Sequence, residues 1–169
     1  MTLWREVDRW RYSYFEPDVD ASQFPKFTNL IEIWQSKRNG RRVPAWKDFD
    51  FYDFKGWHGK LSVYDISYDP YGYTVRLSGV QIDEIYHRTM KGVTNIEMND
   101  LAVHHEDADQ FYEMACRKLY ITNTIGPLNV RNLDYKEIEF FELPLSDDGI
   151  KATHTIEAAI PIRYDGRNA

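Results

Sequence analysis

The chain has 169 residues, of which 43% are hydrophobic and 15% aromatic, and its 21 basic and 27 acidic side chains give a formal net charge of -6. This length and composition predict one compact domain with an apolar core, and the negative balance disfavours a surface that binds phosphate backbones. The single cysteine, Cys116, excludes an internal disulfide, and no apolar run approaches the roughly 20 residues of a membrane span. We therefore expect a cytoplasmic protein that neither crosses a membrane nor binds nucleic acid.

The first 20 residues fit two patterns. Apolar residues recur there at helical spacing, but Trp10, Tyr12 and Tyr14 also alternate with polar residues as in a strand. Both patterns give the segment an apolar face. That face must pack on its own domain or on a second copy of the chain.

A helix is predicted over 24–38, because apolar residues share one face and the sequence Asn39-Gly40 follows as a cap. Pro44 then prevents the helix from continuing and indicates a linker. This region holds the densest basic segment: Lys37, Arg38, Arg41, Arg42 and Lys47. We interpret these cations as a solvated helix end rather than a nucleic-acid surface.

The remaining elements alternate between strands and helices. The predicted strands cover 61–67, 73–79, 124–131, 136–145 and 151–163, and helices or helical turns are predicted over 80–87, 91–102 and 104–121. Asp69-Pro70-Tyr71-Gly72 is a turn signal between the first two strands, which predicts an antiparallel hairpin. Helices between two groups of antiparallel strands, packed on one face of the sheet, indicate an α+β domain.

The order of two strands, helices and three strands is that of a PAS domain, and several motifs resemble a family of short, mainly alphaproteobacterial PAS-like proteins. The predicted helix with Trp34 leads into a basic turn, Arg42-Val43-Pro44-Ala45 and Asp48-Phe49-Asp50. The segments 73–79, 87–92 and 142–149 resemble a core strand, a glycine-containing turn and the final hairpin of that family, although His87 replaces its usual glycine. Together these motifs cover roughly 30–162.

The resemblance implies a five-stranded antiparallel PAS-like sheet preceded by an N-terminal helix. It divides the chain into an N-terminal arm, helix and linker at 1–56, a PAS-like core at 57–165 and a tail at 166–169. It also implies a sensory or regulatory module with no catalytic residue.

The candidate binding residues lie on the predicted strands and the long helix. His154 alternates with apolar residues along the last strand, and a polar ring on an apolar face needs a partner or a cavity. We predict a ligand pocket between the sheet and the long helix, lined by Leu77, Phe111, Met114, Phe141 and His154. The alternative interpretation of His154 is a satisfied core histidine or one that faces outward.

Other chemical motifs are weak. His104-His105-Glu106-Asp107 contains four potential metal ligands, but adjacent helical residues point about 100° apart and do not converge on one ion. We interpret this segment as a polar helix start and predict no metal site. Cys116 lies on the apolar stripe of the long helix, where it acts as a small buried hydrophobe. The glycine spacing predicts neither a dinucleotide site nor a P-loop, and the sequence names no cofactor.

Two functional hypotheses follow. The first is a single-domain sensory module without an attached output domain, which binds a small molecule or a protein partner and forms a homodimer. The second is a small cone-type enzyme of the isomerase or dehydratase kind, which needs a buried acid or base for which Asp65 and His154 are the candidates. The helix order favours the first hypothesis, so we expect no enzymatic activity.

Overall fold

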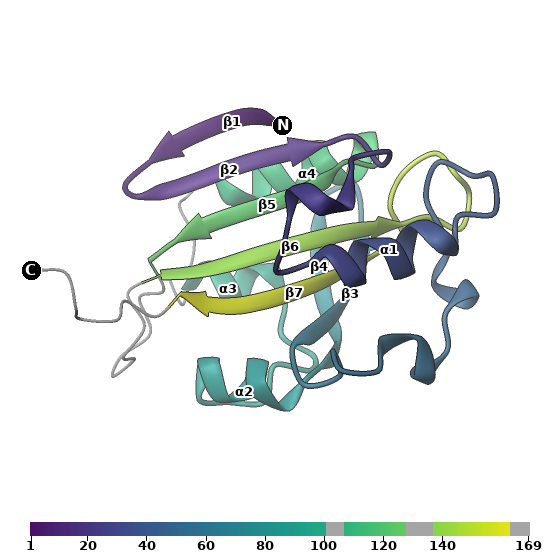
Figure 1. Cartoon of the computed structure of the whole chain (residues 1–169). Helices are drawn as coiled ribbons and strands as arrows, with labels where there is room; N and C mark the ends of the chain where they lie inside the picture. Colours follow the sequence, from purple (N-terminus) through teal and green to yellow (C-terminus); the bar gives the residue numbers. More distant parts are fainter. Residues whose placement is uncertain (101–106, 128–136, 163–169) are drawn as a thin grey trace, which may run out of the picture.

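The computed structural model describes residues 1–100, 107–127 and 137–162. It contains one antiparallel sheet of seven strands in the order β1-β2-β5-β6-β7-β3-β4, with helices on both faces (Figure 1). The strands are β1 (Thr2–Val7), β2 (Trp10–Phe15), β3 (Leu61–Ser67), β4 (Gly72–Ser78), β5 (Ile121–Gly126), β6 (Glu137–Leu145) and β7 (His154–Ile162). The α-helices are α1 (Thr28–Ser36), α2 (Val80–Tyr86), α3 (Asn95–Asp100) and α4 (Ala108–Lys118), and short 3-10 helices occur at Ala21–Gln23, Trp46–Asp48 and Phe51–Phe54.

The N-terminal segment forms a β-hairpin, so the strand pattern rather than the helical pattern describes it. β1 and β2 extend the sheet beyond β5, and Tyr12 of β2 is fully buried. Trp4 packs against Phe111 of α4 with ring centroids 5.2 Å apart. The apolar face of this segment therefore packs on its own domain.

Two features of the predicted architecture need correction. The sheet has seven strands rather than five, because the N-terminal hairpin joins the strands of the expected sheet at the β5 edge. The chain also begins with this hairpin and not with a helix. Helix α1 lies inside the range predicted for a helix, but it follows β2 and comes before β3.

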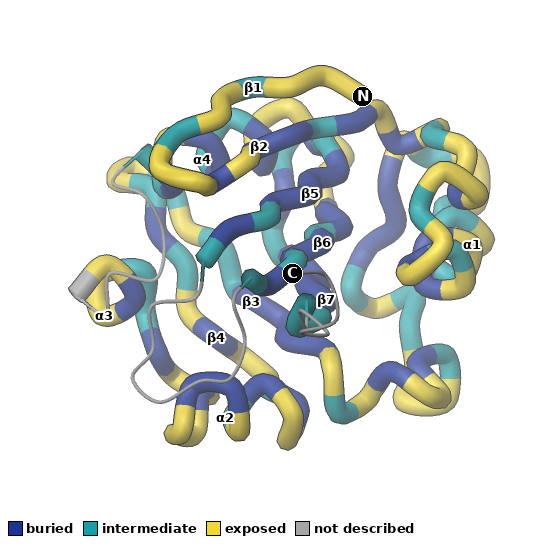
Figure 2. Tube along the Cα trace, turned by 60° about the vertical axis from the view of Figure 1, so that its left-hand side comes forward, coloured by how far each residue is buried: buried dark blue, intermediate teal, exposed yellow. Residues whose placement is uncertain are grey.

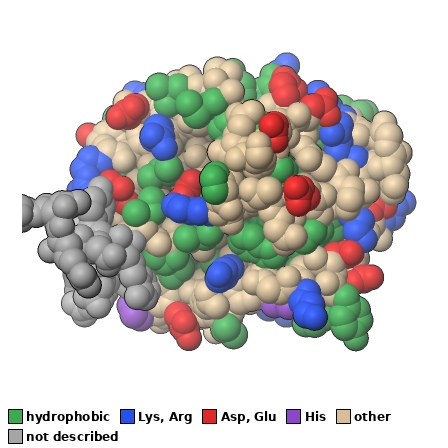
Figure 3. All heavy atoms as spheres, in the orientation of Figure 1, with side chains coloured by type: hydrophobic (Ala, Val, Ile, Leu, Met, Phe, Trp, Pro, Cys, Tyr) green, Lys and Arg blue, Asp and Glu red, His purple; other side chains and the backbone are tan. Residues whose placement is uncertain are grey.

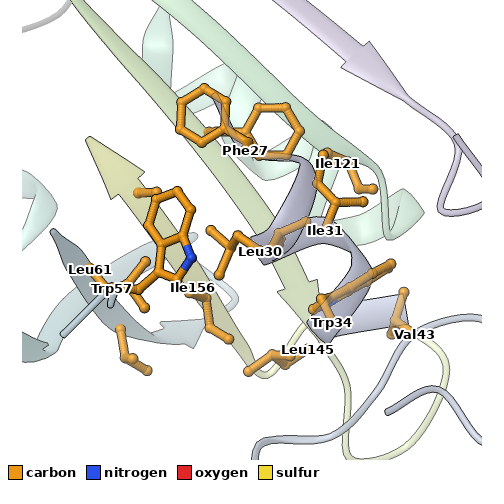
Figure 4. Close-up of a cluster of buried hydrophobic side chains, with 14 of the residues drawn as sticks. Phe27, Leu30, Ile31, Trp34, Val43, Trp57, Leu61, Ile121, Leu145 and Ile156 are labelled. Atoms are coloured by element: carbon orange, nitrogen blue, oxygen red, sulfur yellow. The ribbon is translucent and has the colours of Figure 1, made fainter. Parts of the chain in front are cut away.

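Helix α1 covers one face of the sheet, which corrects the prediction that the helices share a single face (Figures 1 and 4). Its apolar residues Leu30, Ile31 and Trp34 are fully buried against the strands. The Trp34 indole donates a hydrogen bond of 3.0 Å to the carbonyl oxygen of Pro144 in β6. The helix docks here because the residues that the central strands present to this face are also apolar.

Helices α2, α3 and α4 cover the opposite face. Their buried residues include Ile82, Met98 and Phe111, which pack with Phe140 and other strand residues in a second apolar cluster. The central strands thus carry buried residues on both faces, whereas β1 at the edge is mostly exposed (Figure 2). We call the face under α2, α3 and α4 the inner face and the face under α1 the outer face.

The order of elements from β3 to β7 is confirmed, and several boundaries are close to the predictions. The β3–β4 hairpin forms around the predicted turn. Helix α4 ends earlier than predicted, because Leu119 adopts a left-handed conformation with φ of 58° and closes the helix. β5 can therefore begin at Ile121, three residues before the predicted strand, while 128–136 lie outside the described residues.

The docking of the hairpin on β5 depends on a glycine. A Cβ atom at Gly126 would lie 2.2 Å from the ring of Trp10, far inside van der Waals contact. We predict that Gly126→Ala lowers the free energy of unfolding by about 1–3 kcal/mol, the usual cost of overpacking. Denaturant unfolding measures this, with Arg11→Ala at an exposed position of β2 as the control that changes stability by less than about 0.5 kcal/mol. Equal stability of the two variants would contradict the proposed contact.

Candidate functional site

The structure does not bring the five predicted pocket residues together. Phe111 and Met114 lie on α4 and pack in the inner cluster. Phe141 belongs to the outer cluster under α1, and Leu77 is about half exposed beside an outer groove. The side chain of His154 lies on the outer side as well, with its ring 6.5 Å from that of Trp46.

The separation has two physical causes. Along β6, apolar residues occupy both faces, with Ile138 and Phe140 inside and Phe141 outside, so alternation alone does not assign a face. Between β3 and β4 the register shifts, because Val63 of β3 pairs with Leu77 of β4 whereas the next residue, Tyr64, pairs with Val75. A β-bulge of this kind turns Leu77 away from the face that simple alternation predicts.

The surroundings of His154 are those of a partly buried surface residue. Its Nε2 lies 3.3 Å from the Oδ1 of Asp65, and its Nδ1 lies 3.0 Å from the hydroxyl oxygen of Thr153. The carboxylate of Asp65 also accepts a hydrogen bond from Arg76 at 3.0 Å. Asp65 and His154, the two candidates for acid–base chemistry, therefore form a polar cluster at the sheet surface and not a buried catalytic pair.

The other predicted motifs are placed as follows. His104, His105 and Glu106 lie outside the described residues. Cys116 is buried, as its position on the apolar stripe predicted, and burial raises the pKa of its thiol. Within the described ranges, no group of three or more potential metal ligands gathers, and no helix there is long and apolar enough to cross a bilayer.

A small cavity lies on the inner face, between the sheet and helices α3 and α4. Its volume is about 20 Å³, which is room for one or two water molecules. Its lining residues are Tyr64, Ile66, Tyr71, Tyr73, Met98, Tyr112, Glu142, Thr155 and Glu157. The cavity thus combines two carboxyl groups with four tyrosine rings, and none of these lining residues is basic.

The two carboxyl groups are direct cross-strand neighbours. Glu142 of β6 pairs with Glu157 of β7 in the antiparallel register, so their side chains share one face at close range. Glu157 is only 4% exposed, and one of its oxygens accepts a hydrogen bond of 2.8 Å from the hydroxyl of Tyr64. Like charges in such positions repel, and burial adds a desolvation cost for each ionised group.

These costs raise the pKa of both groups. Burial, and then the charge of Glu157, raises the pKa of Glu142 well above its ordinary value, although a hydrogen bond from Thr155 acts in the opposite direction. Burial also raises the pKa of Glu157, against the hydrogen bond from Tyr64. Each carboxyl group therefore keeps its proton to a higher pH than an ordinary glutamate does.

Sequence reasoning missed this pair, although a signal was present. Glu142 and Glu157 interrupt strands whose neighbours are apolar on both sides, as in Phe140-Phe141-Glu142-Leu143. A charged residue in the middle of such a strand is buried whichever face it takes, and buried carboxyl groups with shifted pKa values mark candidate sites. The pairing of the two acids, in contrast, depends on the register of the hairpin.

A second, more open pocket lies on the outer side of β3 and β4. Its volume is about 380 Å³ and its lining is mainly apolar, with Trp46, Phe49, Phe54 and Leu77 among its residues. Phe51 at its rim is 70% exposed and stacks on His58 with ring centroids 4.0 Å apart. This pocket contains Leu77 from the predicted set.

The basic segment after α1 is largely neutralised by acidic partners. The ion pairs there are Lys37–Asp53, Arg38–Asp18, Arg41–Asp48 and Arg42–Glu16. Basic and acidic side chains are accordingly interspersed on the face that Figure 3 shows. This arrangement fits a solvated helix end.

No protein-family model and no curated protein matches the sequence. A similar solved chain is described as "Structure of an RNA-binding Light-Oxygen-Voltage Receptor", with 11% identity and a TM-score of 0.49. The alignment covers 63% of this chain and only 31% of that receptor chain.

The raised pKa values predict an unusual pH dependence of stability. Between the ordinary carboxyl pKa of 4.5 and the raised values, the folded state binds more protons than the unfolded state, so the free energy of unfolding falls as pH rises. Glu142→Gln removes the repulsion between the two carboxylates and should make the free energy of unfolding less dependent on pH. Near pH 8, we expect the free energy of unfolding to be about 1 kcal/mol or more higher than that of the wild type. Denaturant unfolding at several pH values in sodium buffers measures the effect.

The control for this prediction is Glu139→Gln, on the same strand. Glu139 lies near Lys26 and Asn123 rather than beside another carboxyl group, so its replacement should leave the slope unchanged. A wild-type slope that persists in Glu142→Gln would show that the carboxyl pair does not control the titration.

Proposed function

We propose that this chain is a PAS-like sensory or regulatory module that binds a small molecule at the inner cavity. The observation that carries the proposal is the buried pair of Glu142 and Glu157 at a cavity between sheet and helices. Burying two acidic groups side by side costs stability, and such arrangements are retained where they serve recognition or proton transfer. The order of two strands, three helices and three strands supports the PAS-like assignment.

An enzymatic role is the second candidate, and the same carboxyl pair favours it. A buried acid with a raised pKa is what general acid–base catalysis uses. The cavity, however, has room for only one or two water molecules, so it admits a ligand group of one or two heavy atoms but not a substrate of the size that an isomerase or dehydratase converts. We therefore propose a binding function without catalysis. In the alternative of a cone-type enzyme, the candidate acid and base would be Glu142 and Glu157 rather than Asp65 and His154.

The remaining proposals concern partners and location. The ion-paired basic segment supports the proposal that the chain has no nucleic-acid partner, and the single cysteine supports a cytoplasmic location. The homodimer and the protein partner stay predictions, for which native mass spectrometry at increasing concentration gives the oligomeric state.

The test compares ligand responses of the wild type with those of Glu142→Leu/Glu157→Leu. This double variant removes the polar chemistry of the cavity, and replacing buried charged groups by apolar ones is often neutral or stabilising. We predict that a small molecule that co-purifies with the wild type, or raises its melting temperature in a screen, has no effect on the double variant. Native mass spectrometry beside a denatured control detects the co-purified ligand.

The control is again Glu139→Gln, which should respond as the wild type does. Ligands that act equally on the wild type and the double variant would place the binding site elsewhere, for instance in the outer pocket. A complete screen without any response of the folded wild type would refute the sensory function at this cavity.

A further inference from the structure

We propose that the inner cavity binds a primary ammonium group, either the ammonium ion or the head group of a small primary amine. This inference rests on the proposed function and specifies its ligand. The groups that recognise the cation are the carboxyl groups of Glu142 and Glu157, together with the tyrosine rings around them.

Once ionised, the two carboxyl groups have no basic partner among the residues that line the cavity. The lining residues include two acids and no Lys, Arg or His. A cation between Glu142 and Glu157 would replace the mutual repulsion by two attractive interactions, and a low-polarity environment strengthens both. The site therefore favours a positively charged ligand over a neutral or anionic one.

Unused hydrogen-bonding capacity points to a ligand with N–H donors. Among the described residues, the carboxyl group of Glu157 receives a hydrogen bond from Tyr64 alone, at one of its two oxygens. Ser62 of β3 is the cross-strand neighbour of Glu157 on the other side. Its hydroxyl is buried, with the residue only 1% exposed, and has no hydrogen-bond partner in the described structure. A buried polar atom without a partner is costly. Ser62 does not line the cavity, whereas Glu157 does and can accept a further hydrogen bond there from an N–H donor.

The tyrosine rings that line the cavity also favour a cation. Tyr64 and Tyr73 meet edge to face with ring centroids 5.3 Å apart, and Tyr71 and Tyr112 complete the set around the cavity. Tyrosine faces attract cations, and aromatic residues around a cation are a known mode of ammonium recognition. The space for one or two water-sized groups fits an ammonium head group and excludes a bulky quaternary one.

Proton exchange makes the binding depend on pH. The other titratable groups near the pair are Tyr64 of β3, Tyr71 and Tyr73 at the β3–β4 hairpin, Tyr86 of α2, and Tyr112 and the Cys116 thiol of α4. Burial raises the pKa of each of them, so they stay neutral. Asp109 of α4 also acts on Tyr73. The ligand therefore displaces the proton held by the carboxyl pair and releases it to solvent, and affinity increases as pH rises.

The experiment is calorimetric titration of the full chain with ammonium chloride and with methylammonium chloride, at constant ionic strength. Potassium chloride is the matched salt, because potassium is a cation of similar size without N–H donors. We expect both ammonium salts to bind, with an affinity that rises between about pH 5.5 and about pH 8 by up to about tenfold per pH unit. Glu142→Gln and Glu157→Gln should each weaken binding at least about tenfold, whereas Glu139→Gln should bind as the wild type does.

Each alternative result decides the question. Binding of ammonium but not of methylammonium assigns the site to the free ion, and binding of both assigns it to an amine head group. Equal binding of potassium, or binding that survives both Gln variants, would overturn the inference. So would the absence of any ammonium binding to wild-type protein whose circular dichroism shows a folded chain. In that case, a different ligand that acts on the wild type and not on Glu142→Leu/Glu157→Leu would still uphold the proposed function.

Discussion

The register of the β6–β7 hairpin is the constraint on which the rest of the structure depends. Leu145 stands opposite His154, and this pairing places Glu142 opposite Glu157 further along the ladder. Because side chains alternate between faces, the same register turns both acids inward and turns Phe141 and Ile156 outward to α1. A shift of one residue on either strand would separate the acids and break the outer core.

Both faces of the central strands are buried, and this explains how one sheet combines a stable core with a polar site. The outer face holds the apolar cluster around Trp34, whose burial and hydrogen bond to Pro144 fix α1 on the sheet. The inner face is mainly apolar as well, but it includes the carboxyl pair and the tyrosines around it. The outer cluster can therefore stabilise the sheet while the inner face carries groups that cost stability.

The N-terminal hairpin contributes to the same inner face. Trp4 contacts Phe111 of α4, and Trp10 lies over Gly126 of β5. The hairpin thus supports the helix that carries Tyr112, one of the cavity residues. The segment before the predicted core is for this reason an integral part of the sheet.

The sequence by itself determined the elements whose signals are local. Turn residues between β3 and β4, the apolar stripe of α4 and the cap after α1 predicted these elements and their order, because each depends on neighbours a few residues apart. The tertiary structure alone decided which face each strand residue occupies, since β6 and β7 are apolar on both sides and the bulge near Val63 shifts β4. It also decided that the hairpin adds two strands and that two glutamates 15 positions apart meet, because pairing register is a property of the assembled sheet.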